Sequence, residues 1–341
     1  MKKEEMYRIV PTVWLRNDDK FYELVKVFDE YGVRELRINC ARYNIESYTK
    51  EIIDFNNWCK INLGYEFKLL LDLPIPYRKI RIHYPNSGAG KYISQDEIIH
   101  IARDSHMCEN IKNSVYTIDF DKIYTLEIGE SLYVGDNLLE FVILEKMQDV
   151  IVLKCVSGGE LANGKYITTN NVKYQRSTSE DIESYVNMCN IIEASVVAFS
   201  FVNNSDDIRE IIDLESWRCN AKIISKIETE EGYNNVDEIL NYSDMVMVAR
   251  GDLLNNVGVG RFAECSSTII ECCEKVGADY YVATGILDSL KEKSGFVSRA
   301  ELLDVYSLLI KKHAKLILTY GLCKNKEILK KVLSLIQDIK C

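Results

Sequence analysis

Two charged residues lie within one apolar segment of the chain, at a spacing that suits catalysis. Lys226 and Glu228 are two residues apart near the end of the run 222–228, Lys-Ile-Ile-Ser-Lys-Ile-Glu. In a β-strand, residues two apart point to the same face. Burying a cation and a carboxylate is costly unless they are paired or bound to a metal. The spacing therefore predicts that both side chains face one polar site.

The next apolar run, 244–250, supplies a second carboxylate. It ends at Arg250 and is followed by Gly251 and Asp252. Gly251 has no Cβ, so a ligand could approach the backbone closely. Two carboxylates from neighbouring strand ends suit Mg²⁺ or Mn²⁺, which prefer oxygen ligands. An ion-pair network of Lys226, Glu228, Arg250 and Asp252 would account for the same residues, and the pattern alone leaves both readings open.

Alternating strand and helix patterns position these residues. Apolar runs rich in β-branched residues predict strands at 7–13, 33–39, 67–72, 194–202, 222–228, 244–250, 279–284 and 315–319. Helical patterns follow most of them, at 18–31, 45–61, 205–217, 235–242, 261–276, 298–312 and 325–339. Eight such units predict an α/β fold of the (β/α)8 TIM-barrel type, in which the site lies at the C-terminal ends of the strands.

One stretch interrupts the alternation. Between about 82 and 174 the chain carries turn sequences at Pro85-Asn86-Ser87-Gly88, Gly135-Asp136-Asn137 and Gly158-Gly159, between alternating runs such as 150–156. This pattern predicts a small, mostly β domain inserted after the third strand. The expected division is residues 1–81 for the first part of the barrel, 82–174 for the inserted domain and 175–341 for the second part of the barrel.

Charge and composition narrow the class of partner. The chain has 52 acidic and 42 basic residues, a net charge of -10. Nucleic acids and anionic membranes attract basic surfaces, so we expect neither as a partner. No apolar stretch approaches the roughly 18 to 20 residues of a membrane span, which favours a cytoplasmic location. The eleven cysteines include no CxxC pair and are expected to be reduced thiols.

Several segments together resemble one known family. The run 222–240, followed by 243–253, resembles the signature region of pyruvate kinase at almost every position. Shorter matches lie at 35–39, 70–72, 198–202, 283–284 and 298–301, and the segment 158–165 resembles the closing segment of that family's lid domain. The resemblance implies the same barrel and identifies the inserted domain as a lid.

The resemblance also implies a catalytic centre. Glu228 and Asp252 would bind the divalent metal, Mg²⁺ or Mn²⁺. Lys226 would stabilise negative charge on the transferring phosphoryl group and on the enolate, and Arg37 would contact the phosphoryl group. Such an arrangement suits phosphoryl transfer, which demands positioning and charge neutralisation more than covalent work.

Substrate and nucleotide contacts follow from the same resemblance. Thr284 would hold the substrate carboxylate together with the backbone of Gly251 and Asp252. Lys165 would reach a nucleotide, ADP or ATP, from the lid, with Arg37 nearby. The implied small-molecule partners are therefore phosphoenolpyruvate or a keto acid, and a nucleotide.

The chain departs from the family pattern at the monovalent-cation site. That site uses an Asn, a Ser, an Asp and a Thr, and here Asn39 and Asp72 remain while Ala41 and Leu73 replace the other two. Loss of two oxygen ligands predicts that K⁺ is not required. Two nearby arginines, Arg42 and Arg78, could supply permanent positive charge instead.

Further departures lie beyond that site. Pro74 replaces a lysine, Thr319-Tyr320-Gly321 replaces a Ser-Gly-Glu motif, and the family's C-terminal regulatory domain has no expected counterpart. Three functions consequently stay open. The first is a pyruvate kinase-like phosphotransferase, and the second is a metal-dependent lyase, decarboxylase or aldolase acting on an enolisable keto acid without a nucleotide. The third is a non-catalytic, metabolite-binding barrel. The sequence does not indicate an oligomeric state.

Overall fold

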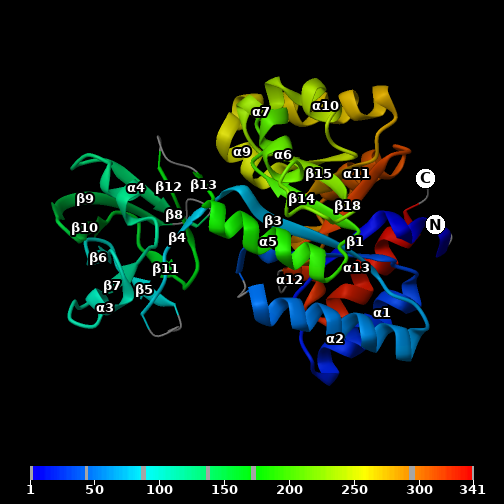
Figure 1. Cartoon of the computed structure of the whole chain (residues 1–341), viewed down its shortest axis with the longest axis horizontal. Coiled ribbons are helices and arrows are strands. Elements are labelled where there is room, and N and C mark those ends of the chain that lie inside the picture. Colours follow the sequence, from blue (N-terminus) through cyan, green and yellow to red (C-terminus); the bar gives the residue numbers. More distant parts are fainter. Residues whose placement is uncertain are drawn as a thin grey trace. The chain divides into compact units, whose positions relative to one another are not determined.

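The computed structural model describes residues 3–42, 45–85, 90–135, 139–169, 174–291 and 296–339. The chain divides into two compact units (Figure 1). The first contains Met1–Pro76 and Ser177–Cys341, and the second contains Tyr77–Arg176. The predicted turn residues Asn86, Ser87, Gly88, Asp136 and Asn137 lie outside the described residues.

A closed parallel barrel forms the first unit. Its strands follow the order β3-β14-β15-β16-β17-β18-β1-β2, and a pairing between β2 and β3 closes the ring. Every pairing within the ring is parallel. The strands are β1 (Ile9–Val13), β2 (Glu35–Asn39), β3 (Lys68–Arg78), β14 (Val196–Ser200), β15 (Lys222–Ile227), β16 (Met245–Ala249), β17 (Tyr280–Ala283) and β18 (Ala314–Leu318). The predicted eight-stranded barrel is confirmed.

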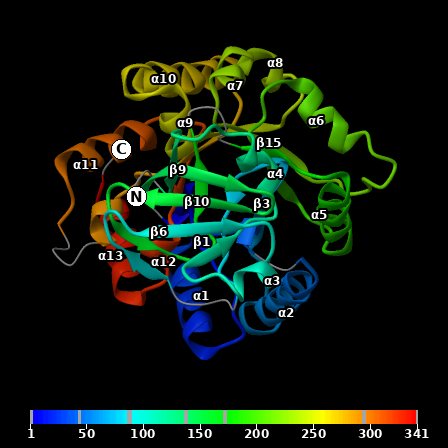
Figure 2. The same ribbon diagram turned by 90° about the vertical axis from the view of Figure 1, so that its left-hand side faces the viewer.

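Helices surround this ring (Figure 2). The longer ones are α1 (Asp19–Tyr31), α2 (Ile45–Leu63), α5 (Ser179–Ile191), α6 (Ser205–Ile212), α10 (Val259–Val276), α11 (Arg299–Leu309) and α13 (Lys326–Asp338). Shorter helical segments are η1 (Lys3–Arg8), η2 (Cys40–Arg42), α7 (Glu230–Asn234), α8 (Val236–Leu240), α9 (Arg250–Val257), η3 (Asp288–Lys291) and α12 (Tyr320–Cys323). Side-chain caps fix several starts: Asp18 accepts from Phe21 N, and Ser298 forms a capping box with Glu301.

Three elements differ from the sequence prediction. Helix α5 was not predicted. Strand β3 continues to Arg78 instead of ending at Asp72, even though Pro74 and Pro76 cannot donate ladder hydrogen bonds. Strand β16 ends at Ala249, whose ψ of 73° leaves the extended conformation, so Arg250 begins helix α9 and does not end the strand.

Apolar side chains fill the barrel interior, and a polar group closes one end of it. Buried residues from alternate strands, including Leu70, Ala198 and Met247, form the interior cluster. Near the N-terminal strand ends, the Tyr281 hydroxyl donates to Glu35 at 2.6 Å and Lys315 Nζ donates to the same carboxylate at 2.8 Å. The barrel interior is therefore packed, and a ligand site can form at the opposite end, where the strands have their C-terminal ends.

The second unit is mostly β. A seven-stranded sheet runs in the order β4-β12-β8-β9-β10-β6-β7, and β11 pairs with β5. The strands are β4 (Ile80–Arg81), β5 (Lys91–Ile93), β6 (Ile98–Ala102), β7 (Ser114–Tyr116), β8 (Ser131–Val134), β9 (Leu139–Met147), β10 (Val150–Cys155), β11 (Gly159–Leu161) and β12 (Tyr166–Thr168). Strand β13 (Gln175–Arg176) pairs with the end of β3, and two short helices are α3 (Ser105–Cys108) and α4 (Phe120–Tyr124). This unit has its own apolar core, which includes Phe141, Ile151 and Leu153.

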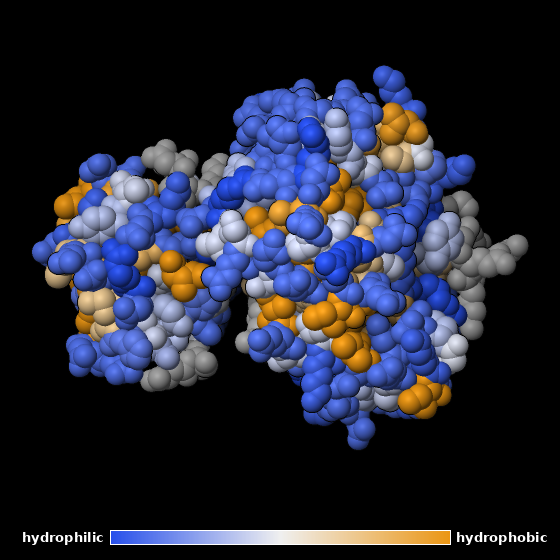
Figure 3. All heavy atoms as spheres, in the orientation of Figure 1, coloured by the Kyte–Doolittle hydropathy of each residue, from blue (hydrophilic) through white to orange (hydrophobic). Residues whose placement is uncertain are grey.

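The surface shown in Figure 3 is mostly hydrophilic, with hydrophobic residues in separate small groups. Within the described part of the chain, no helix combines the length and the apolar character that crossing a bilayer requires.

Candidate active site

A buried lysine lies at the centre of a charged cluster at the C-terminal ends of three barrel strands. Lys226 Nζ lies 3.0 Å from Asp72 Oδ1 and 3.3 Å from Glu228 Oε1. It also donates to Ser200 Oγ at 3.0 Å. Lys226 is 8% exposed, Asp72 3% and Glu228 1%, so water screens these contacts poorly. Lys226 and Glu228 do share one side of the chain, as their spacing predicts.

Arg37 from β2 joins the cluster through Asp72. Its Nε and Nη2 atoms donate to Asp72 Oδ2 at 2.9 and 2.5 Å, and Nη1 donates to Thr12 Oγ1 at 2.9 Å. Burial raises the pKa of Asp72, but Lys226 and Arg37 outweigh it and leave this pKa below its ordinary value. Burial lowers the pKa of Lys226, yet Asp72 and Glu228 outweigh it and leave that pKa raised. Both groups are therefore charged at neutral pH.

The Glu228 carboxyl group has a raised pKa. Burial raises its pKa to about 7; Lys226 opposes the rise, and Asp252 and Asp72 add to it. Its Oε2 atom accepts from the backbone N–H of Phe201 at 2.7 Å, where Phe201 has φ 54°. Glu228 is buried and Asp252 is half-buried, and a pair of carboxylates there would suit a divalent cation, which prefers oxygen ligands.

The other expected ligand, Asp252, lies in the first turn of α9. Asn256, one turn later, donates to the carbonyl oxygens of both Glu228 and Asp252, at 2.8 and 2.9 Å, which joins the end of β15 to α9. Among the described residues no three His, Cys, Asp or Glu side chains could hold a metal ion by themselves. A bound Mg²⁺ or Mn²⁺ would therefore take its remaining ligands from water and substrate, as these ions commonly do.

Thr284 lies against the first turn of the same helix. A Cβ atom at Gly251 would come within 3.3 Å of both Thr284 Oγ1 and Cγ2, so a side chain there would require Thr284 to shift slightly. Arg250 donates to the Thr284 carbonyl and to Asp304. Arg250 thus belongs to a separate pair, and the four-residue network with Lys226 that the sequence left open does not form as such.

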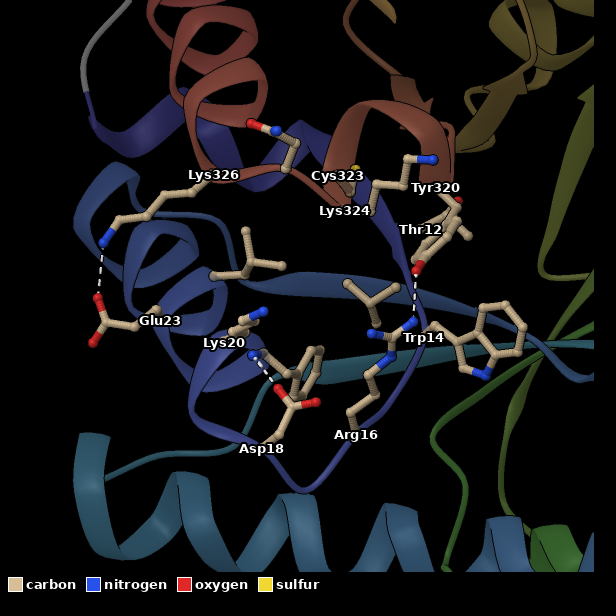
Figure 4. A pocket seen from close by; sticks show the side chains of 14 residues that line it. Thr12, Trp14, Arg16, Asp18, Lys20, Glu23, Tyr320, Cys323, Lys324 and Lys326 are labelled. Atoms are coloured by element: carbon tan, nitrogen blue, oxygen red, sulfur yellow. Dashed lines mark hydrogen bonds and ion pairs between the residues drawn. The ribbon is translucent and has the colours of Figure 1, made fainter.

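A cavity of about 420 Å³ is lined in part by Thr12, the residue whose hydroxyl accepts from Arg37 (Figure 4). Trp14 and Tyr320 meet on its wall with ring centroids 5.6 Å apart in an edge-to-face arrangement. Arg16 donates to the Tyr320 hydroxyl at 3.3 Å, and Lys324 also lines the cavity. Its lining therefore offers flat aromatic surface beside charged groups of both signs.

Comparison with known proteins shows the family of this chain. A family model described as pyruvate kinase, barrel domain, matches residues 7–318. The chain belongs to the pyruvate kinase family. It is 30% identical over 289 residues to the pyruvate kinase of Clostridium perfringens. This alignment covers 83% of this chain and 59% of that protein. The pyruvate kinase of Sporosarcina psychrophila is 30% identical over 292 residues, covering 83% and 48%.

A solved structure shows the same fold. The crystal structure of Cryptosporidium parvum pyruvate kinase matches with a TM-score of 0.81 and 23% identity, covering 96% of this chain and 69% of that chain. The chain spans about half of the length of the two curated pyruvate kinases.

The residues that remain from the pyruvate kinase cation site are occupied by protein contacts. Asn39 Oδ1 accepts from Ala41 N at 3.1 Å, and Asp72 is paired with Arg37 and Lys226. The Leu73 carbonyl accepts from Ser200 Oγ at 2.7 Å.

The structure describes a partner for one of the two arginines expected to compensate. Arg78 pairs with Asp119 at 2.6 and 2.8 Å in the second unit, and the side chain of Arg42 is outside the described part. Lys165 lies in the second unit between β11 and β12, packed beside Gly135. Its contact with a nucleotide stays a prediction.

Sequence reasoning missed three residues of this site. Ser200, Thr12 and Asn256 each hold a charged residue or its backbone in place. Ser200 lies in the segment 198–202 that carried the resemblance, which was a usable signal. Thr12 and Asn256 are ordinary polar residues whose contacts depend on the folded chain.

Proposed function

We propose that this protein transfers a phosphoryl group between phosphoenolpyruvate and a nucleotide, with Mg²⁺ or Mn²⁺ as cofactor. The observation that carries the proposal is the buried group of Lys226, Asp72, Arg37 and Glu228, with Asp252 beside it. The group holds two cations, Lys226 and Arg37, beside the Asp72 and Glu228 carboxylates at the C-terminal end of the barrel, and charge neutralisation of this kind is what the proposed reaction needs.

Each residue has a part in this proposal. Glu228 and Asp252 would hold the metal, which when bound supplies positive charge to phosphoryl and enolate oxygens. Lys226, held charged by Asp72 and Glu228, stabilises the negative charge that develops on the enolate oxygen as the phosphoryl group leaves. Arg37, oriented by Asp72 and Thr12, keeps its guanidinium ready for the phosphoryl oxygens.

Within the barrel unit, the nucleotide would contact Arg37. The cavity that shares Thr12 with the cluster supports a place for its base, because Trp14 and Tyr320 offer aromatic surface and Arg16 offers charge. Thr284, with the backbone of Gly251 and Asp252, would hold the substrate carboxylate.

K⁺ is not required in this proposal. Asp72 and Asn39 already have protein partners, and Ala41 has no side-chain oxygen to add. Arg37 and Lys226 both lie within 3.0 Å of the Asp72 carboxylate and can supply permanent charge there. These two cations inside the cluster are further candidates for the compensating role, besides Arg42 and Arg78.

The test is a coupled assay with phosphoenolpyruvate, ADP and Mg²⁺ that follows pyruvate. It is run in potassium and in tetramethylammonium buffers at equal ionic strength. We expect pyruvate formation at rates that agree within about twofold between the two cations. Absence of pyruvate formation in both would overturn the proposed kinase activity, and a strong K⁺ requirement would overturn only the claim about the cation.

A second function is favoured by one observation. Lys226, Glu228, Asp252 and Thr284 all lie in the barrel unit, so enolate chemistry on a keto acid needs no residue of the second unit. Exchange of the methyl hydrogens of pyruvate in deuterium oxide, with Mg²⁺ and without nucleotide, tests this. Exchange without kinase activity would support a lyase, decarboxylase or aldolase.

A further inference from the structure

Thr284 has a backbone conformation that a β-branched residue rarely adopts. Its φ is 75°, and Gly285 follows with φ 78°. Such a conformation costs roughly 1 to 3 kcal/mol and persists only where surrounding contacts hold it. The turn after β17 must therefore be held by the residues around it.

Arg250, the first residue of helix α9, forms hydrogen bonds with this turn. Its Nε and Nη2 atoms donate to the Thr284 carbonyl at 2.9 and 2.6 Å. Its remaining terminal nitrogen, Nη1, donates to both oxygens of Asp304 on α11, each at 2.9 Å. One edge of the planar guanidinium thus points at Thr284 while Asp304 fixes the other end.

A second contact holds the next residue of the turn. Gly285 N donates to Asp288 Oδ2 at 3.3 Å. The other oxygen of Asp288 accepts from Thr319 Oγ1 at 2.8 Å and pairs with Lys291 Nζ at 2.7 Å. The Gly285–Asp288 hydrogen bond is longer than those between Arg250 and the Thr284 carbonyl, so Arg250 is the main restraint on the turn.

We infer that Asp304 is a positioning residue, which acts through Arg250 to hold Thr284 against Gly251 at the first turn of α9. The side chains of Arg250 and Asp304 are 14% and 30% exposed, so their pairing is partly shielded from water. Without the carboxylate, the guanidinium loses the contact that fixes its direction, and the strained turn can relax. The inference rests on the proposed function only where it concerns substrate binding by Thr284.

The experiment compares Asp304→Asn with a matched control, Asp213→Asn. Asp213 also pairs with an arginine, Arg209, but at 3.7 Å and with a 64% exposed side chain. The first measurement is the NMR signal of the Thr284 methyl group, assigned through Thr284→Ser. The second is KM for phosphoenolpyruvate and kcat.

We expect the Thr284 methyl signal to move in Asp304→Asn and to stay in place in Asp213→Asn. KM should rise about tenfold with kcat changed less than about threefold, because a displaced positioning group weakens substrate binding. If Asp304→Asn does not fold, Arg250→Lys carries the same test, since lysine keeps the charge but loses the planar fork.

The two proposals fail separately. An unmoved Thr284 methyl signal in Asp304→Asn and in Arg250→Lys would overturn the positioning role, whatever the enzyme does. A methyl signal that moves in a protein without phosphotransferase activity would support the positioning role and overturn the proposed function. Equal kinetic changes in Asp304→Asn and Asp213→Asn would also count against a specific role for Asp304.

Discussion

Replacing Lys226 with methionine tests how strongly the buried cluster depends on its central charge. The substitution keeps a chain of similar length but removes the cation that lies 3.0 Å from Asp72 and 3.3 Å from Glu228. Two carboxylates that are nearly inaccessible to water then lose a partner. Asp72 retains Arg37, whereas the Glu228 carboxylate retains only its hydrogen bond from Phe201 N among the contacts described above.

The expected loss follows from these distances. At an effective dielectric constant of about 20, each charge pair at this separation is worth about 5 kcal/mol before desolvation is subtracted. Removing one partner of a buried ion pair usually costs about 3 to 5 kcal/mol. Because Arg37 still neutralises Asp72, we expect about 3 kcal/mol for Lys226→Met, together with a fall in turnover of at least about a hundredfold.

Urea unfolding followed by tryptophan fluorescence measures this loss in the relevant unit. All three tryptophans, Trp14, Trp58 and Trp217, belong to the barrel unit, so the signal does not report on the second unit. Lys222→Met is the matched control, since Lys222 is the exposed first residue of the same strand. This control should change the free energy of unfolding by less than about 0.5 kcal/mol.

A double-mutant cycle with Asp72→Asn isolates the pairing. We expect a coupling energy of about 2 kcal/mol between Lys226→Met and Asp72→Asn, within the range for residues in one charged network. A loss below about 1 kcal/mol in Lys226→Met, or additive effects in the cycle, would refute the claim that this lysine is held by direct pairing.

Three further predictions concern the metal pair and two structural contacts. Mg²⁺ or Mn²⁺ at about a hundred times its Kd should stabilise the protein by about 2.7 kcal/mol, measured as a thermal shift that EDTA reverses. Asp252→Asn should abolish this shift, whereas Asp206→Asn, a change at an exposed residue, should leave it intact. Lys315→Met should destabilise the barrel unit by about 3 kcal/mol, because buried Glu35 loses its charged partner. Adding Glu35→Gln should recover part of the lost stability, and no recovery would contradict this pairing. Arg8→Ala should cost about 2 kcal/mol in urea unfolding, because Arg8 donates to four carbonyl oxygens around the end of α11 and the start of β18; a loss under about 0.5 kcal/mol would contradict it.

Local rules in the sequence account for the barrel and for part of the candidate site. Alternating strand and helix patterns predicted eight parallel strands because each βα unit is specified by its own periodicity and caps. The two-residue spacing of Lys226 and Glu228 placed both on one side, since the strand repeat is two. Asp252 was expected nearby because neighbouring parallel strands end at the same edge.

Partners of the charged groups were decided by the tertiary structure. The sequence left open an ion-pair network that joins Arg250 to Lys226, but Arg250 begins helix α9 and contacts Asp304 and Thr284. Asp72, expected only as a remnant of a cation site, pairs with both Arg37 and Lys226. Residue type shows that a charge needs a partner, but the partner is chosen by distance across the closed barrel, and that distance depends on the register of all eight strands.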